Sequence, residues 1–197
     1  MTLDRRAGHR IGSICLARHG LPDVDRNQRL TAEEYVHWWA DYDRADLKPG
    51  QVPPQALLDV AREADVVFAS TLPRARATAA AVAGGKDVIV DPVFVEAPLP
   101  PPPLPCKFSA RMWGVWARTA WWFGRADGGE SREEAEVRAQ AAAATLTARA
   151  LRGENVLLCA HGWFNRMMRP VLKSQGWVCV HDGGDTYWSH RRYEKKS

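Results

Sequence analysis

The sequence predicts one α/β domain over residues 1–197, a three-layer α/β/α sandwich with a mainly parallel sheet. Short runs that suit strands alternate with longer stretches of helical periodicity. Such alternation is typical of a sheet covered by helices on both faces. Apolar residues make up 46% of the chain and charged residues 25%, which is ordinary for a globular protein of this length.

Six short runs have the length expected of strands. Those in the first 160 residues are almost wholly apolar and end in polar loops, which favours buried strands. The expected strands are residues 11–17, 65–70, 87–91, 155–160, 177–181 and 186–190.

The segments between these runs carry the start and stop signals of helices. Thr31 and Ser131 are each followed three residues later by a Glu, which is a capping-box pattern. Pro73 suits the first turn of an Ala-rich helix that ends near a Gly-Gly pair. The expected helices are residues 31–43, 55–63, 73–84 and 131–151, and a further one from about residue 163.

The stretch after the third strand departs from this alternation, and we interpret about residues 97–127 as a Pro/Trp-rich insertion or cap. Residues 98–105 are nearly all proline and are expected to be extended polyproline II. Residues 107–123 are a candidate helix. Its apolar stripe at helical spacing consists of Met112, Trp113, Trp116, Ala117, Ala120 and Trp121. The stripe suits packing on the core, a lid that selects substrates, or a membrane or partner surface.

The charge pattern argues against a nucleic-acid partner. The net charge is +4, and the basic residues, mostly Arg, are dispersed. Arg suits the recognition of phosphate and carboxylate groups. Only residues 190–196 are densely basic, and we interpret them as a solvated terminus, with a ligand-steering element as the alternative.

The cysteines favour a cytoplasmic location. None forms a CxxC pair, and Cys15, Cys159 and Cys179 lie inside apolar runs, where a thiol is expected to be a small core side chain. No stretch is long enough to span a membrane, and residues 11–17 suit a strand better than a signal peptide. A homodimer is left open by the sequence.

Polar side chains follow four of the predicted strands. Arg18, His19 and Gly20 follow the first strand, and Ser70 and Arg74 follow the second. A carboxylate follows the third strand at Glu96, and an imidazole follows the fourth at His161. Because ligands of open α/β sheets bind at the carboxyl ends of the strands, we expect these side chains to converge.

This set of side chains suits the chemistry of a phosphate group. Two Arg can offer forked donors, a neutral imidazole is a competent nucleophile toward phosphorus, and a carboxylic acid can protonate a leaving oxygen. No metal or other cofactor is expected, because phosphoryl transfer depends mainly on positioning and electrostatics. No cluster in the sequence has metal-ligand spacing.

The motifs themselves resemble those of a known family. Residues 16–20 (Leu-Ala-Arg-His-Gly) resemble the RHG signature of the histidine phosphatase superfamily, which includes the phosphoglycerate mutases. Residues 70–79 are similar to the family's second-arginine motif, and residues 156–162 to its second-histidine motif. Residues 128–131 (Gly-Gly-Glu-Ser) are similar to a stretch found before the long helix in many members.

The resemblance implies a phosphohistidine intermediate on His19 and a phosphate pocket made by Arg18, Arg74 and His161. Ser70 and Gly20 are expected to join the pocket. Glu96 occupies the place of the family's acid, with Asp23, Asp25 and Glu130 as alternative donors. We otherwise interpret Glu130 as a solvated or helix-dipole residue.

One departure from the family pattern bears on the substrate. Many members continue the RHG signature with a Thr and an Asn that contact the phosphate, whereas residues 21–25 here are Leu-Pro-Asp-Val-Asp. The expected activity is that of a metal-independent phosphomonoesterase acting on a small phosphorylated metabolite. The alternatives are a phosphoglycerate-mutase-like phosphotransferase and a catalytically weak protein that binds a phosphorylated ligand.

Overall fold

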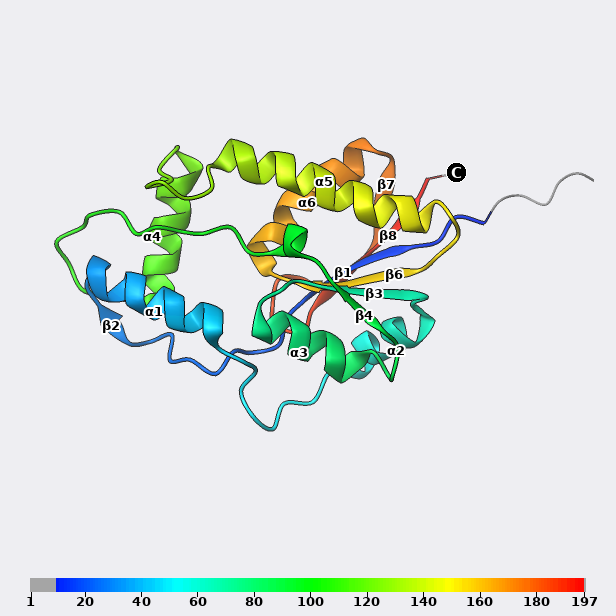
Figure 1. Cartoon of the computed structure of the whole chain (residues 1–197), viewed down its shortest axis with the longest axis horizontal. Helices are drawn as coiled ribbons and strands as arrows, with labels where there is room; N and C mark the ends of the chain where they lie inside the picture. The colour runs from blue at the N-terminus through cyan, green and yellow to red at the C-terminus, as the bar shows by residue number, and fades with distance from the viewer. Residues whose placement is uncertain (1–9, 197) are drawn as a thin grey trace, which may run out of the picture.

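The computed structural model describes residues 10–196, which form a mainly parallel sheet with helices on both faces (Figure 1). The strands of this sheet are β1 (Ile14–Arg18), β3 (Val66–Ala69), β4 (Val88–Val90), β6 (Val156–Ala160), β7 (Trp177–Asp182) and β8 (His190–Lys195). Their order is β4-β3-β6-β1-β8-β7. The first four are parallel, whereas β8 is antiparallel to β1 and β7. The predicted fold class is confirmed.

The helices lie in two layers and an extension. They are α1 (Ala32–Arg44), α2 (Gln55–Glu63), α3 (Pro73–Val82), α4 (Ala110–Trp122), α5 (Arg132–Ala150) and α6 (Gly162–Ser174), with a short 3-10 helix η1 (Pro92–Phe94). Helices α5 and α6 cover one face of the sheet and α2 and α3 the other, while α1 and α4 lie together beyond one end (Figure 1). Thr31 and Ser131 form capping boxes, and Pro73 lies in the first turn of α3, as predicted.

Strand β1 separates two apolar cores, because alternate side chains of a strand point to opposite faces. Ile14 and Leu16 belong to a large core that includes side chains of α4, α5 and α6. Cys15 and Ala17 belong to a smaller core with α2 and α3. The strand is therefore apolar on both faces until Arg18 at its carboxyl end.

The basic tail is an internal strand of the sheet, so its interpretation as a solvated terminus is wrong. Strand β8 pairs with β1 on one side and β7 on the other. Tyr193 is buried, and Arg191 and Arg192 form ion pairs with carboxylates on β7 and α2. These ion pairs give the two arginines partners within the protein, in place of the water molecules that we expected to solvate them. The strand expected at residues 186–190 is also wrong, since this segment turns and β8 begins at its last residue.

The cysteine prediction is correct for two residues and wrong for one. Cys15 and Cys159 are buried free thiols, and burial raises the pKa of the Cys159 thiol to about 12. Cys179 is exposed, because β7 is an edge strand and only its first residue, Trp177, is buried. Separately, none of the helices within residues 10–196 combines the length and apolar character needed to cross a bilayer.

The Pro/Trp-rich insertion is partly as predicted. Residues 98–105 form neither helix nor strand. The expected helix begins only at Ala110, because β5 (Phe108–Ser109) pairs with β2 (Arg29–Leu30).

Helix α4 buries a narrower stripe than the spacing predicts. Trp113, Ala117 and Trp121 are fully buried, whereas Met112 and Trp116 are 44% and 41% exposed. The helix packs against α1 and β5, and residues at the edge of the predicted stripe remain partly exposed to solvent. Of the three roles that the sequence allows for the apolar stripe, packing in the core is therefore the correct one for Trp113.

Trp113→Ala is expected to lower the free energy of unfolding by about 3–5 kcal/mol. The indole is fully buried, and its Nε1 donates to the Leu30 carbonyl at 2.7 Å. Trp116→Ala, on the exposed side of the same helix, should cost about 1 kcal/mol or less. Urea unfolding of both variants measures the difference, and equal losses would contradict this assignment.

Candidate active site

Side chains from separate motifs meet at the carboxyl ends of the parallel strands. Arg18 ends β1, Ser70 follows β3 and His161 follows β6. The ring centroids of His19 and His161 are 5.2 Å apart. A cavity of about 280 Å³ lies here, and its lining includes Arg18, His19 and Glu96. We call it the catalytic-site cavity below. The convergence expected from the sequence is thus present in the structure.

His19 is held in one tautomer by its neighbour. Its Nδ1 lies 2.7 Å from the Gly20 carbonyl oxygen, which can only accept, so Nδ1 carries the proton. The lone pair is then on Nε2. Burial lowers the pKa of His19 well below its usual range, and the charges of Arg74 and Arg18 lower it further. The imidazole is therefore neutral at neutral pH and can act as a nucleophile.

The turn after His19 is fixed from two sides. The Gly20 N–H donates to Thr78 Oγ1 at 2.9 Å, and a Cβ added at Gly20 would come within 2.4 Å of the Trp188 ring. Trp188 Nε1 donates to Gln51 Oε1 at 2.8 Å. Gly20 is expected from the sequence to join the phosphate pocket, but its N–H is used inside the protein. Sequence reasoning missed Thr78, Trp188 and Gln51 as supports, and only Thr78 lies within a motif that it identified.

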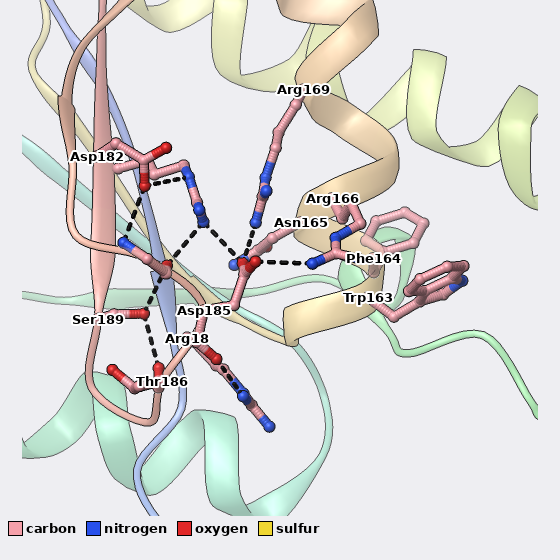
Figure 2. A network of polar contacts seen from close by, with 12 residues as sticks. Arg18, Trp163, Phe164, Asn165, Arg166, Arg169, Asp182, Asp185, Thr186 and Ser189 are labelled. Atoms are coloured by element: carbon pink, nitrogen blue, oxygen red, sulfur yellow. Dashed lines mark hydrogen bonds and ion pairs between the residues drawn. The ribbon is translucent and has the colours of Figure 1, made fainter. Parts of the chain in front are cut away.

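Arg18 is oriented by the segment between β7 and β8. Its guanidinium lies 4.2 Å from the Tyr187 ring centroid, and its Nη1 donates to the Asp185 carbonyl. The Asp185 carboxylate in turn pairs with Arg166 and Arg191, each at 2.8 Å. Figure 2 shows Asp185 at the centre of this network, between α6 and the two antiparallel strands. Nothing in the sequence singled out Asp185.

Arg74 is fully buried and is bound mainly within the protein. Its Nη1 donates to the Tyr42 carbonyl at 2.8 Å, and its Nη2 pairs with Asp43 at 3.2 Å. The guanidinium carbon also lies 4.2 Å from the Tyr42 ring centroid. The forked donors that we expected to face phosphate are therefore occupied by α1. Arg74 still acts on the site electrostatically, because its charge depresses the pKa of His19.

Ser70 contacts His161. Its Oγ lies 2.8 Å from His161 Nε2 and accepts a longer bond of 3.4 Å from the Leu72 N–H. If the hydroxyl donates to Nε2, the His161 proton is on Nδ1, which is buried and has no partner within residues 10–196. Ser70 thus orients the imidazole, and His161 Nδ1 is left to serve a ligand.

Glu96 lies where α6 begins. Its carboxylate accepts from the Phe164 N–H at 2.9 Å and from the Trp163 N–H at 3.3 Å. Burial raises the pKa of Glu96, while the charges of Arg118 and Arg74 and these two hydrogen bonds oppose the rise. The carboxyl group lines the catalytic-site cavity, so it is placed to exchange a proton there.

Glu130 supports the segment that carries Glu96. It forms a bidentate pair with Arg138, with both N–O distances 2.6 Å. Arg138 Nη1 also donates to the Val93 and Val95 carbonyls at 2.9 and 2.7 Å. The interpretation of Glu130 as a solvated residue is wrong, since its partner lies eight residues further along, inside α5, and the helix brings the two together.

The outer wall of the cavity comes from α1 and α4. Helix α1 contributes aromatic side chains, among them Tyr35 and Trp39. Helix α4 contributes Arg111, Val115 and Arg118. The insertion thus faces the site, but with arginines in place of the Trp stripe. Asp23 and Asp25 are absent from this lining, which leaves Glu96 and Asp185 as its carboxylates among the residues that the structure describes.

A metal has no evident place in this arrangement. Over the described range, 10–196, no group of three or more His, Cys, Asp or Glu side chains could hold a metal ion. The charge beside His19 comes from guanidinium groups, which suit the binding of a phosphorylated compound.

A match to a protein family agrees with a site that binds a phosphorylated compound. A model of the histidine phosphatase superfamily (branch 1) matches residues 14–176, and the chain belongs to that family. A comparison of the sequence with curated proteins finds no match.

Solved structures with the same fold include both phosphatases and a mutase. A mycobacterial glucosyl-3-phosphoglycerate phosphatase is 22% identical, with a TM-score of 0.53 over 83% of this chain and 80% of that chain. A phosphoglycerate mutase from Bacillus anthracis is 16% identical, with a TM-score of 0.58 over 85% and 82%. A phosphoserine phosphatase variant from Entamoeba histolytica is 15% identical, with a TM-score of 0.51 over 87% and 92%. At these identities the likeness shows the shared fold.

Proposed function

We propose that this protein is a metal-independent phosphomonoesterase that hydrolyses a small phosphorylated metabolite through a phosphohistidine on His19. One observation carries the proposal. Arg18 Nε, Arg74 Nε and His161 Nδ1 are each buried without a partner in the part of the chain that the structure describes. Buried donors are nearly always satisfied, so three unused ones beside a neutral His19 support a bound phosphoryl group. Membership of the family supports phosphatase or mutase chemistry.

In the first step, the lone pair on His19 Nε2 forms a bond to phosphorus. The bond between phosphorus and the ester oxygen breaks, and its electron pair stays on that oxygen. Glu96 gives its proton to the departing alkoxide, a transfer that the raised pKa of this carboxyl group supports. Arg18, Arg74 and His161 stabilise the charge on the phosphoryl oxygens.

In the second step, water attacks the phosphorus of phosphohistidine. The Glu96 carboxylate left by the first step accepts a proton from this water. The bond between phosphorus and Nε2 breaks, its electron pair returns to the imidazole, and inorganic phosphate leaves. Gly20 and Ser70 act by holding the two imidazoles in the required tautomers.

Rapid-mixing kinetics with nitrophenyl phosphate test this function. A covalent intermediate should give a burst of nitrophenolate equal to the enzyme concentration whenever its hydrolysis is the slower step. A phosphotransferase would place labelled phosphate on a second substrate molecule, whereas a hydrolase places it in water. A phospho-ligand-binding protein would release no nitrophenolate, and that result would contradict the proposal.

Exhaustive chelation is expected to leave the rate of hydrolysis unchanged. The developing charge is met by Arg and His, so no ion is needed to balance it. The rate is measured after dialysis against a chelator and again after adding magnesium or zinc. A loss on chelation that either metal restores would contradict the mechanism.

We propose a cytoplasmic location, which is supported by four free cysteines in a chain that forms no disulfide among residues 10–196. A phosphorylated small molecule remains the proposed partner.

A further inference from the structure

Two apolar hollows lie next to the catalytic-site cavity and share lining residues with it. One hollow, of about 570 Å³, lies between α5, α6 and the end of α4, and Trp122, Met167 and Val171 line it. The other, of about 310 Å³, is lined by α4 residues and by Trp163. Trp163 lines all three spaces, and Arg166 lines both the catalytic-site cavity and the larger hollow. We call the two outer hollows together the α4–α6 groove.

The groove is unusually apolar for a surface. Trp122 is 42% exposed and Phe123 is 83% exposed, and both belong to its walls. Trp122 lines both hollows, so their apolar surfaces meet at one side chain. Large apolar side chains gathered in a hollow commonly mark a binding site.

Two arginines and the indole N–H of Trp163 lie where the α4–α6 groove borders the catalytic-site cavity. The Arg118 and Arg166 guanidinium carbons lie 4.9 and 5.6 Å from the Trp163 ring centroid. Trp163 Nε1 is buried without a partner among the described residues. Trp163 and Arg166 project from the first turns of α6, beside the Asp185 network that orients Arg18 (Figure 2). A ligand that spans the groove and the catalytic-site cavity therefore lies against these donors.

We infer that the α4–α6 groove binds the hydrocarbon part of the substrate, so that the enzyme acts on amphiphilic phosphomonoesters. The phosphate lies at His19, and the chain of the leaving alcohol passes Trp163 into the groove. This inference rests on the proposed phosphatase function. The lining residues that the groove shares with the catalytic-site cavity favour a part of the substrate as the occupant, since a separate partner protein would need no place beside His19.

A series of n-alkyl phosphates from methyl to octyl, each below its micelle concentration, tests the inference. Burying one methylene group is expected to raise kcat/KM by about twofold to fourfold, until the groove is filled. The same value of kcat/KM from methyl to octyl phosphate would overturn the inference while leaving the phosphatase function intact. Hydrolysis of none of the series, together with no label on His19, would instead overturn the function.

Two tryptophans on one helix provide a matched pair of variants. Trp122 lines the groove, whereas Trp116, equally exposed at 41%, lines neither hollow nor the catalytic-site cavity. Trp122→Ala should reduce the gain in kcat/KM between methyl and octyl phosphate by at least about tenfold, because the chain loses apolar contact. Trp116→Ala should leave the whole series unchanged. Equal gains in the two variants would place the chain elsewhere and overturn the inference.

Discussion

His19→Ala is expected to lower the hydrolysis of every phosphomonoester by about 10⁴- to 10⁶-fold. The variant has no atom to form the bond to phosphorus, so the two-step path is lost. After incubation with a labelled phosphomonoester and a quench that avoids acid, the normal enzyme should carry label on His19 and the variant should carry none.

The control for this variant must separate chemistry from folding. His19 is 2% exposed, so the melting temperature is measured alongside activity, and His19→Gln provides a variant closer in volume. His37→Ala, at an exposed position of α1, should keep full activity. A folded His19→Ala protein that retains near-normal turnover or label would show that another residue is the nucleophile.

Glu96→Gln is expected to slow alkyl phosphates by about 10²- to 10⁴-fold and nitrophenyl phosphate much less. An alkoxide needs a proton as it leaves, whereas nitrophenolate is a stable anion. Steady-state kinetics on the two substrate types give the ratio directly. Asp23→Asn, which changes the rival carboxylate, should leave the ratio unaltered, and equal slowing of both substrates by Glu96→Gln would assign Glu96 a structural role.

The pH dependence of hydrolysis provides a second test of the role of Glu96. Hydrolysis of alkyl phosphates requires protonated Glu96 and neutral His19. Because the pKa of Glu96 is raised, the protonated form persists above the usual carboxyl range, and kcat/KM should fall as pH rises through this pKa. Because the pKa of His19 is lowered, the neutral form persists into acid. Glu96→Gln should lose the alkaline decline, and comparison with the normal enzyme cancels the ionisation of the substrate.

Variants of Arg18 and variants of Arg74 are expected to affect different properties of the enzyme. Arg18 lines the catalytic-site cavity, whereas Arg74 is fully buried against Tyr42 and Asp43. Loss of Arg74 would remove the support of α1 and shift the pKa of His19 at the same time. Variants of Arg18 therefore report on phosphate binding more directly.

The sequence by itself determined the order of elements and the residues that meet at the sheet edge. Local signals were sufficient for this, because capping boxes, Pro73 and apolar runs act over a few residues. The placement of Arg18, His19, Glu96 and His161 followed from one rule of α/β sheets, that the carboxyl ends of parallel strands share an edge.

The tertiary structure alone decided which contacts these residues make. The basic tail became the internal strand β8 because its backbone pairs with β1, which is distant in sequence, and with β7. Arg192 of this strand also pairs with the distant Glu63. The donors of Arg74 turned to α1, and Glu130 became the partner of Arg138. The tautomer of His161 depends on Ser70, which lies 91 positions away. Each of these outcomes depends on groups brought together only by folding, and local periodicity carries no information about such pairs.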